Sequence, residues 1–150
     1  MAPALVLVPL CTIELTLGEM QVVGDGPSGS RLIVHVGGGV VSGERLSGQL
    51  HPAGMADWVT VNGTVASVDV RGTIDTDDGA LVYVSYGGRF DITNGPGSSP
   101  IYVAPRFETS DGRYTWLNLV QAVGVGTLTG DRLHHEWFEA TVPDAVLLDT

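Results

Sequence analysis

Apolar and polar residues alternate with a period of two along most of the chain. This period is typical of β-strands that bury one face, because successive side chains of a strand point to opposite faces. Helical periodicity is almost absent. The segments with the alternating pattern are Leu5–Leu17, Arg31–Val36, Val40–Leu50, Ala56–Val61, Val65–Asp75, Ala80–Tyr86, Ile101–Glu108, Tyr114–Val123 and Arg132–Ala140. The pattern therefore predicts an all-β protein.

Short turn motifs separate several of these segments. Asn62-Gly63, Asp78-Gly79 and Asp111-Gly112 each lie between two predicted strands, and such dipeptides tolerate the positive φ angles of tight hairpins. Sequential strands are then expected to be antiparallel neighbours. The turn-rich stretch 94–100 predicts a mobile loop between two strands, a common place for loops that border binding sites. Gly37-Gly38-Gly39 favours a kink or bulge at a barrel corner.

The length of 150 residues suits one domain, which we expect to span residues 1–150. The 21 glycines and eight prolines leave little room for long helices. Antiparallel strands in this number either pack as two sheets or close into a ring, and closure removes exposed sheet edges. We predict a single up-and-down β-barrel of about 8–10 strands with an internal pocket, since about eight strands can enclose one small ligand.

Charge and cysteine content exclude several classes of partner. The net charge is −10, with 17 acidic and seven basic residues, so binding to nucleic acid or to an anionic membrane surface is not expected. The apolar start lacks the basic region of a signal peptide and contains Pro3 and Pro9. Cys11 is the sole cysteine, which precludes an intramolecular disulfide and suggests a buried thiol. We expect a cytoplasmic protein that binds a small molecule; a homodimer is compatible with the sequence.

One predicted strand has a polar face. Ser67, Asp69, Arg71, Thr73 and Asp75 alternate with smaller or apolar residues and share that face. Two interpretations are open. The face is solvated, as in many half-buried strands, or it lies inside the barrel, where burial would require Asp69 and Arg71 to pair or to bind a ligand.

A second polar face combines an arginine with aromatic and amide side chains. Tyr102, Arg106 and Glu108 share one face of their segment, and Trp116 and Asn118 share a face of the next. A hairpin at Asp111-Gly112 would bring these groups together, in a composition typical of a small-molecule site. The alternative is a solvated face with a cross-strand ion pair.

Asp57 and Trp58 place a carboxylate beside a large aromatic ring at the start of a strand. A carboxyl group held against an indole in a dry pocket has a raised pKa, which suits acid or base catalysis. Adjacent strand residues need not share a face. The alternative is therefore that Trp58 fills the core while Asp57 caps a turn.

Motifs for metals and cofactors are weak. His134-His135-Glu136 offers metal-binding side chains, but neighbouring strand residues face opposite ways and no third ligand follows at a familiar spacing. Gly24–Gly29 fits the glycine spacing of a dinucleotide motif, yet Pro27 and a following strand replace the required helix. We interpret it as a turn, and we expect no metal and no cofactor.

Several segments together resemble the family known as domain of unknown function 3237, also called uncharacterised protein family 0311. They are Pro9–Glu14, Gly26–Arg31, Ala56–Trp58, Thr76–Val84, Pro105–Thr109, Arg113–Asn118 and Val123–Gly126, in the family's order. The resemblance implies a small antiparallel barrel similar to lipocalins and calycins, without a settled activity. Asp75, where the family often has a basic residue, the stretch 85–88 and the end of the chain after residue 142 depart from the family pattern.

Barrels of this general shape include ligand carriers and cofactor-free cyclases, isomerases, lyases and decarboxylases, an analogy at the level of fold alone. We expect a cofactor-independent acid/base enzyme acting on a small, partly apolar carbonyl or polyketide-like compound, with a non-catalytic carrier or sensor of hydrophobic ligands as the alternative. The expected proton-transfer residue is Asp57, with Glu108 or Asp69 as substitutes. The expected oxyanion-stabilising residues are Arg106, Arg71 and Tyr83. The expected pocket-shaping residues are Trp58, Trp116, Tyr102 and Asn118.

Overall fold

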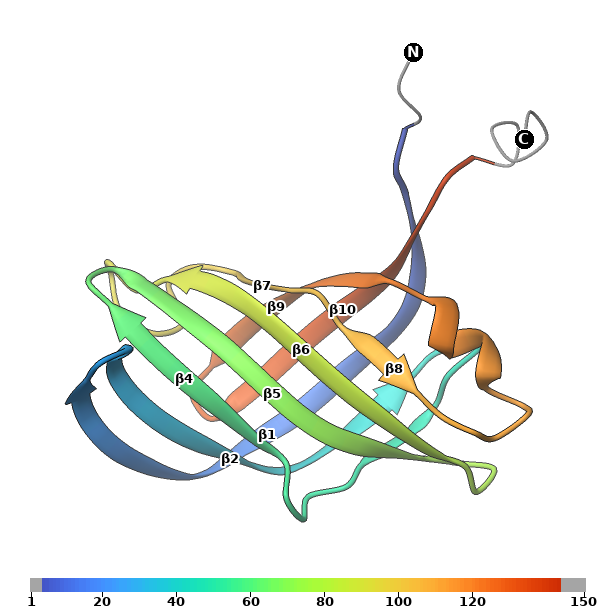
Figure 1. The fold of residues 1–150 in the computed structure, drawn as a ribbon, viewed down its shortest axis with the longest axis horizontal. Helices are drawn as coiled ribbons and strands as arrows, with labels where there is room; N and C mark the ends of the chain where they lie inside the picture. The colour runs from blue at the N-terminus through green and yellow to red at the C-terminus, as the bar shows by residue number, and fades with distance from the viewer. Residues whose placement is uncertain (1–3, 144–150) are drawn as a thin grey trace.

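The computed structural model describes residues 4–143, which form one β-barrel (Figure 1). The strands are β1 (Val6–Gly26), β2 (Gly29–Ser42), β3 (Gly48–Leu50), β4 (Ala56–Asn62), β5 (Val65–Thr76), β6 (Leu81–Asp91), β7 (Ile101–Val103), β8 (Arg106–Glu108), β9 (Ala122–Thr129) and β10 (Arg132–Thr141), and a 3₁₀ helix η1 (Thr115–Leu119) precedes β9.

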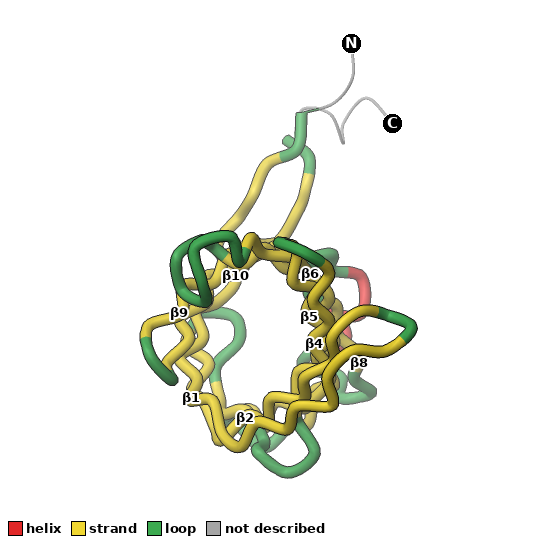
Figure 2. The backbone as a smooth tube through the Cα atoms, turned by 90° about the vertical axis from the view of Figure 1, so that its left-hand side faces the viewer, coloured by secondary structure: helices red, strands yellow, loops and turns green. Residues whose placement is uncertain are grey.

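The strands close into a ring, which Figure 2 shows end-on. Antiparallel pairing runs in the order β1, β2, β4, β5, β6, β7, β9 and β10, and β10 pairs back onto β1. The short β3 lies between β2 and β5, and β8 continues beside β6. The prediction of an all-β, antiparallel barrel is confirmed.

The apolar positions of each strand face the interior. In β5 the inward residues are Val68, Val70 and Ile74, and in β6 they are Val82 and Val84, all of them buried. One continuous core of such residues fills much of the ring, because period-two alternation places every second side chain inside. Cys11 belongs to this core, and its burial raises the pKa of the thiol to about 12.

Two of the three predicted hairpins are confirmed. Gly63 and Gly79 have φ angles of +60° and +90°, at the β4–β5 and β5–β6 turns. The prediction of a hairpin at Asp111-Gly112 is wrong, because the chain enters η1 and β9 begins only at Ala122. The Asp111 carboxylate accepts a hydrogen bond from the backbone N–H of Arg113 at 3.0 Å, which favours a local turn over strand pairing.

The structure also changes several strand boundaries. β1 extends to Gly26, and the segment predicted at 31–36 lies within β2. The segment predicted at 40–50 divides between the end of β2 and β3, with residues 43–47 outside any strand. Thr16 pairs with Gly38 and Leu17 with Val36, so Gly37 is an additional residue of the kind expected in a β-bulge. The segment predicted at 101–108 divides into β7 and β8 around Ala104 and Pro105. Gly24–Gly29 lies at the tip of the β1–β2 hairpin, where Pro27 and Ser28 form the turn between the paired strand ends.

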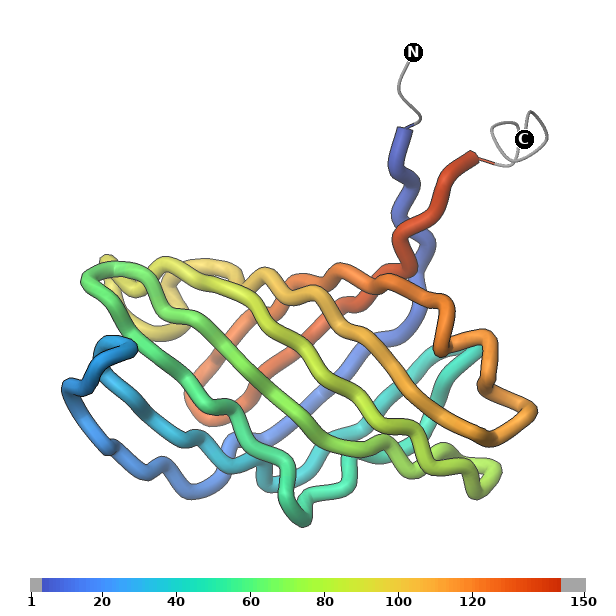
Figure 3. Tube along the Cα trace, in the orientation of Figure 1, coloured from blue at the N-terminus to red at the C-terminus, as the bar shows by residue number. Residues whose placement is uncertain are grey.

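The two ends of the barrel differ. The β1–β2, β4–β5 and β9–β10 turns and the β6–β7 loop lie at one end, which we call the hairpin end (Figure 3). Away from it, the first residues of β1 and the last of β10 leave the barrel as a two-stranded ribbon, pairing Leu7 with Ala140 (Figure 3). In residues 4–143 no helix is long and apolar enough to cross a bilayer.

Candidate functional site

A small hollow lies inside the barrel and contains three titratable side chains. Its volume is about 30 Å³, and Asp57, Tyr86 and His135 are the titratable groups of its lining. The other lining residues are aliphatic: Leu15, Leu17, Val36, Val68, Val70, Ile101, Val103 and Leu133. A polar group in such surroundings either finds a partner or pays a desolvation cost. The hollow is therefore the part of the interior in which chemistry is expected.

Asp57 faces the interior because of its register in β4. It pairs with Val34 of β2 and with Val70 of β5, whose side chains are both buried. The β4–β5 ladder resumes only at Thr60 with Ser67. In this gap the Oδ1 atom of Asp57 accepts a hydrogen bond from the backbone N–H of Asp69 at 2.9 Å. The carboxyl group therefore replaces part of the ladder while it lines the hollow.

The pKa of Asp57 is raised to about 6. Burial is the main cause, since it disfavours the charged carboxylate, and the negative charge of Asp69 adds to the rise. The hydrogen bond from the Asp69 N–H opposes both effects. Asp57 thus exchanges its proton close to neutral pH, as a general acid or base must.

Tyr86 lies in the same row of the sheet as Asp57. Val70 of β5 pairs with Asp57 on one side and with Tyr86 of β6 on the other. The Tyr86 side chain is buried, and burial, with a smaller contribution from the Asp57 charge, raises the pKa of its hydroxyl well above the ordinary value. The phenol therefore keeps its proton and is a hydrogen-bond donor at neutral pH.

His135 lines the hollow from β10. It is 1% exposed, and neither Nδ1 nor Nε2 has a hydrogen-bond partner among the described residues. Burial, together with the neighbouring charge of His134, lowers the pKa of His135 to about 4. The ring is therefore neutral at pH 7, with one N–H donor and one acceptor nitrogen.

Aromatic packing fixes the position of this imidazole. The ring centroid of His135 lies 5.8 Å from that of Tyr86 and 5.9 Å from that of Trp137, both in edge-on geometry. A Cβ atom on Gly126 of β9 would lie 2.7 Å from Cε1 of His135, and one on Gly124 would collide with the Trp137 indole. These two glycines leave the space that the two rings occupy.

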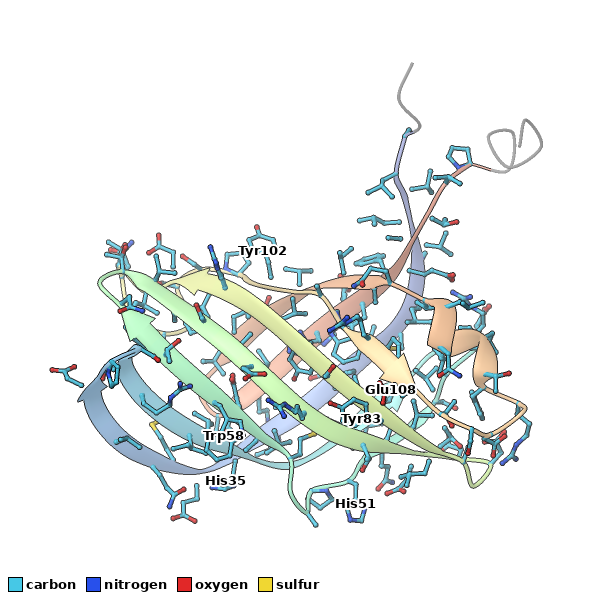
Figure 4. The ribbon with its side chains drawn as sticks, viewed as in Figure 1. His35, His51, Trp58, Tyr83, Tyr102 and Glu108 are labelled. Atoms are coloured by element: carbon cyan, nitrogen blue, oxygen red, sulfur yellow. The ribbon has the colours of Figure 1, made fainter. Side chains whose placement is uncertain are left out.

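Most of the residues predicted to form the site lie on the outside of the barrel. Trp58 is 48% exposed and Tyr102 is 63% exposed, and Figure 4 shows both projecting from the barrel surface. Asp69 and Arg71 are also exposed, with their nearest charged atoms 3.9 Å apart. The interpretation that placed Asp69 and Arg71 inside the barrel is therefore wrong, because the alternation of β5 directs Val68 and Val70 inward.

A group of the predicted residues does assemble on this outer surface. Arg71, Ser85 and Arg106 pair across β5, β6 and β8, and Tyr83 pairs with Glu108 in the next row (Figure 4). Two shallow grooves of about 320 and 370 Å³ share Tyr83, Ser85 and Arg106 in their lining. The predicted polar residues are thus near one another, but they do not share a cavity with Asp57.

The expected strand that carries Trp116 and Asn118 is a helix, yet Asn118 still lines one of the outer grooves with Arg106 and Glu108. The Asn118 side chain accepts a hydrogen bond from the Thr109 N–H at 2.8 Å and donates one to the Thr109 carbonyl at 2.9 Å. The Trp116 ring lies under the guanidinium of Arg45, 5.0 Å from the ring centroid. Neither residue lines the hollow.

The sequence interpretation missed Tyr86 and His135 as site residues. His134 and His135 do face opposite sides, as adjacent strand residues should: His134 is half-buried and contacts Glu14 on the outside, while His135 is inside. The available signal was the alternation of His135 with Leu133 and Trp137, which marks a titratable side chain on an apolar face. Among the described residues, no three His, Cys, Asp or Glu side chains cluster as a metal site would require.

Comparison with known proteins identifies the family. Residues 5–142 match the family described as protein of unknown function DUF3237. The chain belongs to this family. A UPF0311 protein of Rhodopseudomonas palustris is 32% identical over 145 residues, which cover 89% of this chain and 95% of that protein. The resemblance noted from the sequence is therefore confirmed.

Solved structures share the fold. A β-barrel-like protein from Acinetobacter baumannii has 27% identity and a TM-score of 0.86, covering 94% of this chain and 99% of its own. A conserved protein of unknown function from Rhodopseudomonas palustris has 29% identity and a TM-score of 0.85, covering 93% and 100%. A structure described as an enzyme from Penicillium herquei has 25% identity and a TM-score of 0.66, covering 93% and 96%. A similar barrel thus occurs in a protein described as an enzyme.

Proposed function

We propose that this DUF3237 protein is a cofactor-independent acid/base enzyme whose site is the barrel interior. Its substrate is a small, partly apolar carbonyl compound, and its reaction is of the lyase, isomerase or cyclase type. The observation that carries the proposal is the inward carboxyl group of Asp57, whose pKa is raised to about 6 in a mainly aliphatic hollow. Enzymes tune carboxyl groups to this range by burial in order to move protons at neutral pH.

Asp57 has a distinct role from its polar neighbours. As a carboxylate it removes a proton from carbon or oxygen, and as a carboxylic acid it returns one; such catalysis is worth roughly 10²–10⁴-fold. The Tyr86 phenol remains protonated and donates a hydrogen bond toward negative charge that develops on the substrate. The aliphatic walls exclude water and complement the apolar part of the substrate.

Substrate entry requires the hairpin end of the barrel to open. The hollow of about 30 Å³ has room for about one water molecule, whereas pockets for organic ligands usually measure about 300–1,000 Å³. Leu17 and Leu133 border the hollow close to the hairpin end, where the Leu17 N–H binds the Asp131 carbonyl at 2.8 Å. Next to Leu17, the bulge at Gly37 interrupts regular pairing of β1 with β2. Movement of the β1–β2 hairpin at this bulge enlarges the hollow.

A second candidate is a non-catalytic carrier or sensor of small hydrophobic molecules. The specific observation in its favour is that eight of the eleven residues lining the hollow are aliphatic. Burial of apolar surface is sufficient for binding a hydrophobic ligand, and the same pocket serves both functions. The similarity to a protein described as an enzyme favours catalysis.

The test is proton exchange at carbon, which requires no knowledge of the natural substrate. The protein is incubated in D₂O with butanone, cyclohexanone or 2-cyclohexenone, and deuterium incorporation is followed by mass spectrometry. Wild-type protein should accelerate the exchange of at least one ketone. Asp57→Asn should lower that rate by 10²-fold or more, while Glu19→Gln, an exposed carboxylate on β1, should leave it unchanged. Ligand binding without exchange would favour the carrier.

A further inference from the structure

The imidazole of His135 packs in the core, but its two ring nitrogens have no role in the fold itself. Both ring nitrogens are buried without a hydrogen-bond partner among the described residues, although buried polar groups ordinarily have one. Helping to fill the core would not require a heteroaromatic ring, because a phenyl ring packs at lower desolvation cost. His135 also lines the hollow that contains Asp57. A ligand in that hollow is the partner that the structure leaves available.

His135 and Asp57 approach the hollow from different walls of the barrel. Asp57 is on β4, and β2 and β1 separate it from β10, which carries His135. Tyr86 bridges the two sides, since it shares a sheet row with Asp57 and contacts the His135 ring edge-on. A small ligand between these walls meets a proton acceptor on one side and a hydrogen-bond donor on the other.

The donor is neutral and held in place. The low pKa of His135, about 4, keeps the ring uncharged at neutral pH. The ring therefore donates one N–H hydrogen bond and does not transfer a proton to the Asp57 carboxylate. Gly126, Tyr86 and Trp137 pack closely around the ring. Donors fixed in advance at the position of developing charge stabilise an oxyanion effectively, because they need no reorganisation during the reaction.

We propose that His135 donates a hydrogen bond to the substrate's carbonyl oxygen while Asp57 removes a proton from the adjacent carbon, so the substrates are enolisable ketones or enones. This rests on the proposed function. The C–H bond breaks and its proton forms an O–H bond on Asp57. The electron pair forms a C=C bond, and the carbonyl π electrons move onto oxygen, which becomes an enolate held by the His135 N–H. Return of the proton to the α- or γ-carbon completes exchange or isomerisation.

The experiment uses 4-fluorophenol, whose phenolate resembles a dienolate in shape and charge. Its affinity for the full chain is measured by ¹⁹F NMR. His135→Phe, which retains an aromatic ring but no donor, should weaken binding by tenfold or more, and His135→Gln, which restores an N–H donor, should recover part of the loss. His134→Gln is the matched control, since His134 is half-buried on the same strand and does not line the hollow, and it should bind as wild type does. The His135 ring ¹⁵N signals of the wild-type protein should shift on binding.

The outcomes separate this inference from the proposed function. Equal affinity of wild type and His135→Phe, unchanged ¹⁵N signals, or no binding to wild-type protein would overturn the role of His135, even if Asp57→Asn abolishes deuterium exchange. The converse outcome is that 4-fluorophenol binds in a His135-dependent way while no ketone exchanges deuterium. That result would support His135 as a hydrogen-bond donor to the ligand and reject the proposed enzymatic function. If His135→Phe does not fold, His135→Gln and the wild-type ¹⁵N spectrum decide.

Discussion

The Oδ1 atom of Asp57 accepts a hydrogen bond from the backbone N–H of Asp69 at 2.9 Å, within a gap of the β4–β5 ladder. The two aspartates nevertheless point to opposite sides of the barrel wall. Asp57 lines the interior hollow, whereas the Asp69 side chain is exposed on the surface. The β4–β5 pair thus holds the Asp57 carboxyl group, whose pKa is raised, on the inner side of the wall and the solvated Asp69 carboxyl group on the outer side.

The raised pKa of Asp57 predicts a pH-dependent loss of stability. With a pKa of about 6 in the folded state and about 3.9 in the unfolded state, the folded protein binds more protons between these values. The free energy of unfolding should therefore fall as the pH rises from about 4 to about 6, by up to about 3 kcal/mol. Urea denaturation of wild type and Asp57→Asn at pH 4 and pH 8 measures this, and the variant should lack the fall.

Glu19→Gln provides the control for this series, because Glu19 is an exposed carboxylate. Its stability should follow that of the wild type across the pH range. A parallel course for Asp57→Asn and wild type between pH 4 and pH 8 would show that Asp57 is not desolvated in the folded protein.

The glycines of β9 predict a steric effect on the aromatic cluster. A Cβ atom at Gly126 would lie 2.7 Å from Cε1 of His135, so Gly126→Ala should displace the ring and lower the free energy of unfolding by about 1–3 kcal/mol. Gly112→Ala is the matched control, since its added methyl group meets no atom within 4 Å. Equal stability of the two variants, measured by urea denaturation, would mean that Gly126 does not limit the space for His135.

Arg45 predicts a salt-sensitive link at the barrel end opposite the hairpin end. Its Nη1 lies 2.8 Å from Oε1 of Glu139 on β10, and its guanidinium covers the Trp116 ring of η1. Arg45→Met removes both contacts and should lower the free energy of unfolding by about 1 kcal/mol. The loss is small because both contacts are partly solvated. Comparison with Glu139→Gln and the double variant in a mutant cycle gives the coupling, which should decrease in 1 M NaCl. Zero coupling at low salt would exclude an energetic role for the pair.

The fold could be predicted from the sequence because alternation and turn dipeptides are local properties. The orientation of a polar face is less local. In β5, Asp69 and Arg71 face outward because Val68 and Val70 on the other face are more apolar. Comparing the polarity of the two faces therefore favours the interpretation in which Asp69 and Arg71 are solvated. The composition of Trp116 and Asn118 suggested a strand face, but the side-chain hydrogen bonds of Asn118 to Thr109 belong to a turn that alternation does not reveal.

Asp57 was identified correctly as an unusual carboxyl group, although its environment is different from the one expected. Trp58 lies on the opposite, exposed face, and aliphatic side chains of distant strands bury Asp57 instead. These side chains meet around Asp57 only when the strands close into a barrel, and no single segment of the sequence determines that closure. His135 could in principle have been identified from the sequence, since its pairing with Gly126 belongs to the local β9–β10 hairpin. The homodimer and the cytoplasmic location stay predictions.

The central claim is that the chemistry takes place inside the barrel and not on its polar outer surface. The most direct measurement compares ketone deuterium exchange by Asp57→Asn with that by Arg106→Met, which alters an exposed arginine of the outer grooves. We predict that Asp57→Asn loses the exchange activity of the wild type while Arg106→Met retains it. Loss of activity in Arg106→Met with full activity in Asp57→Asn would contradict the interior site.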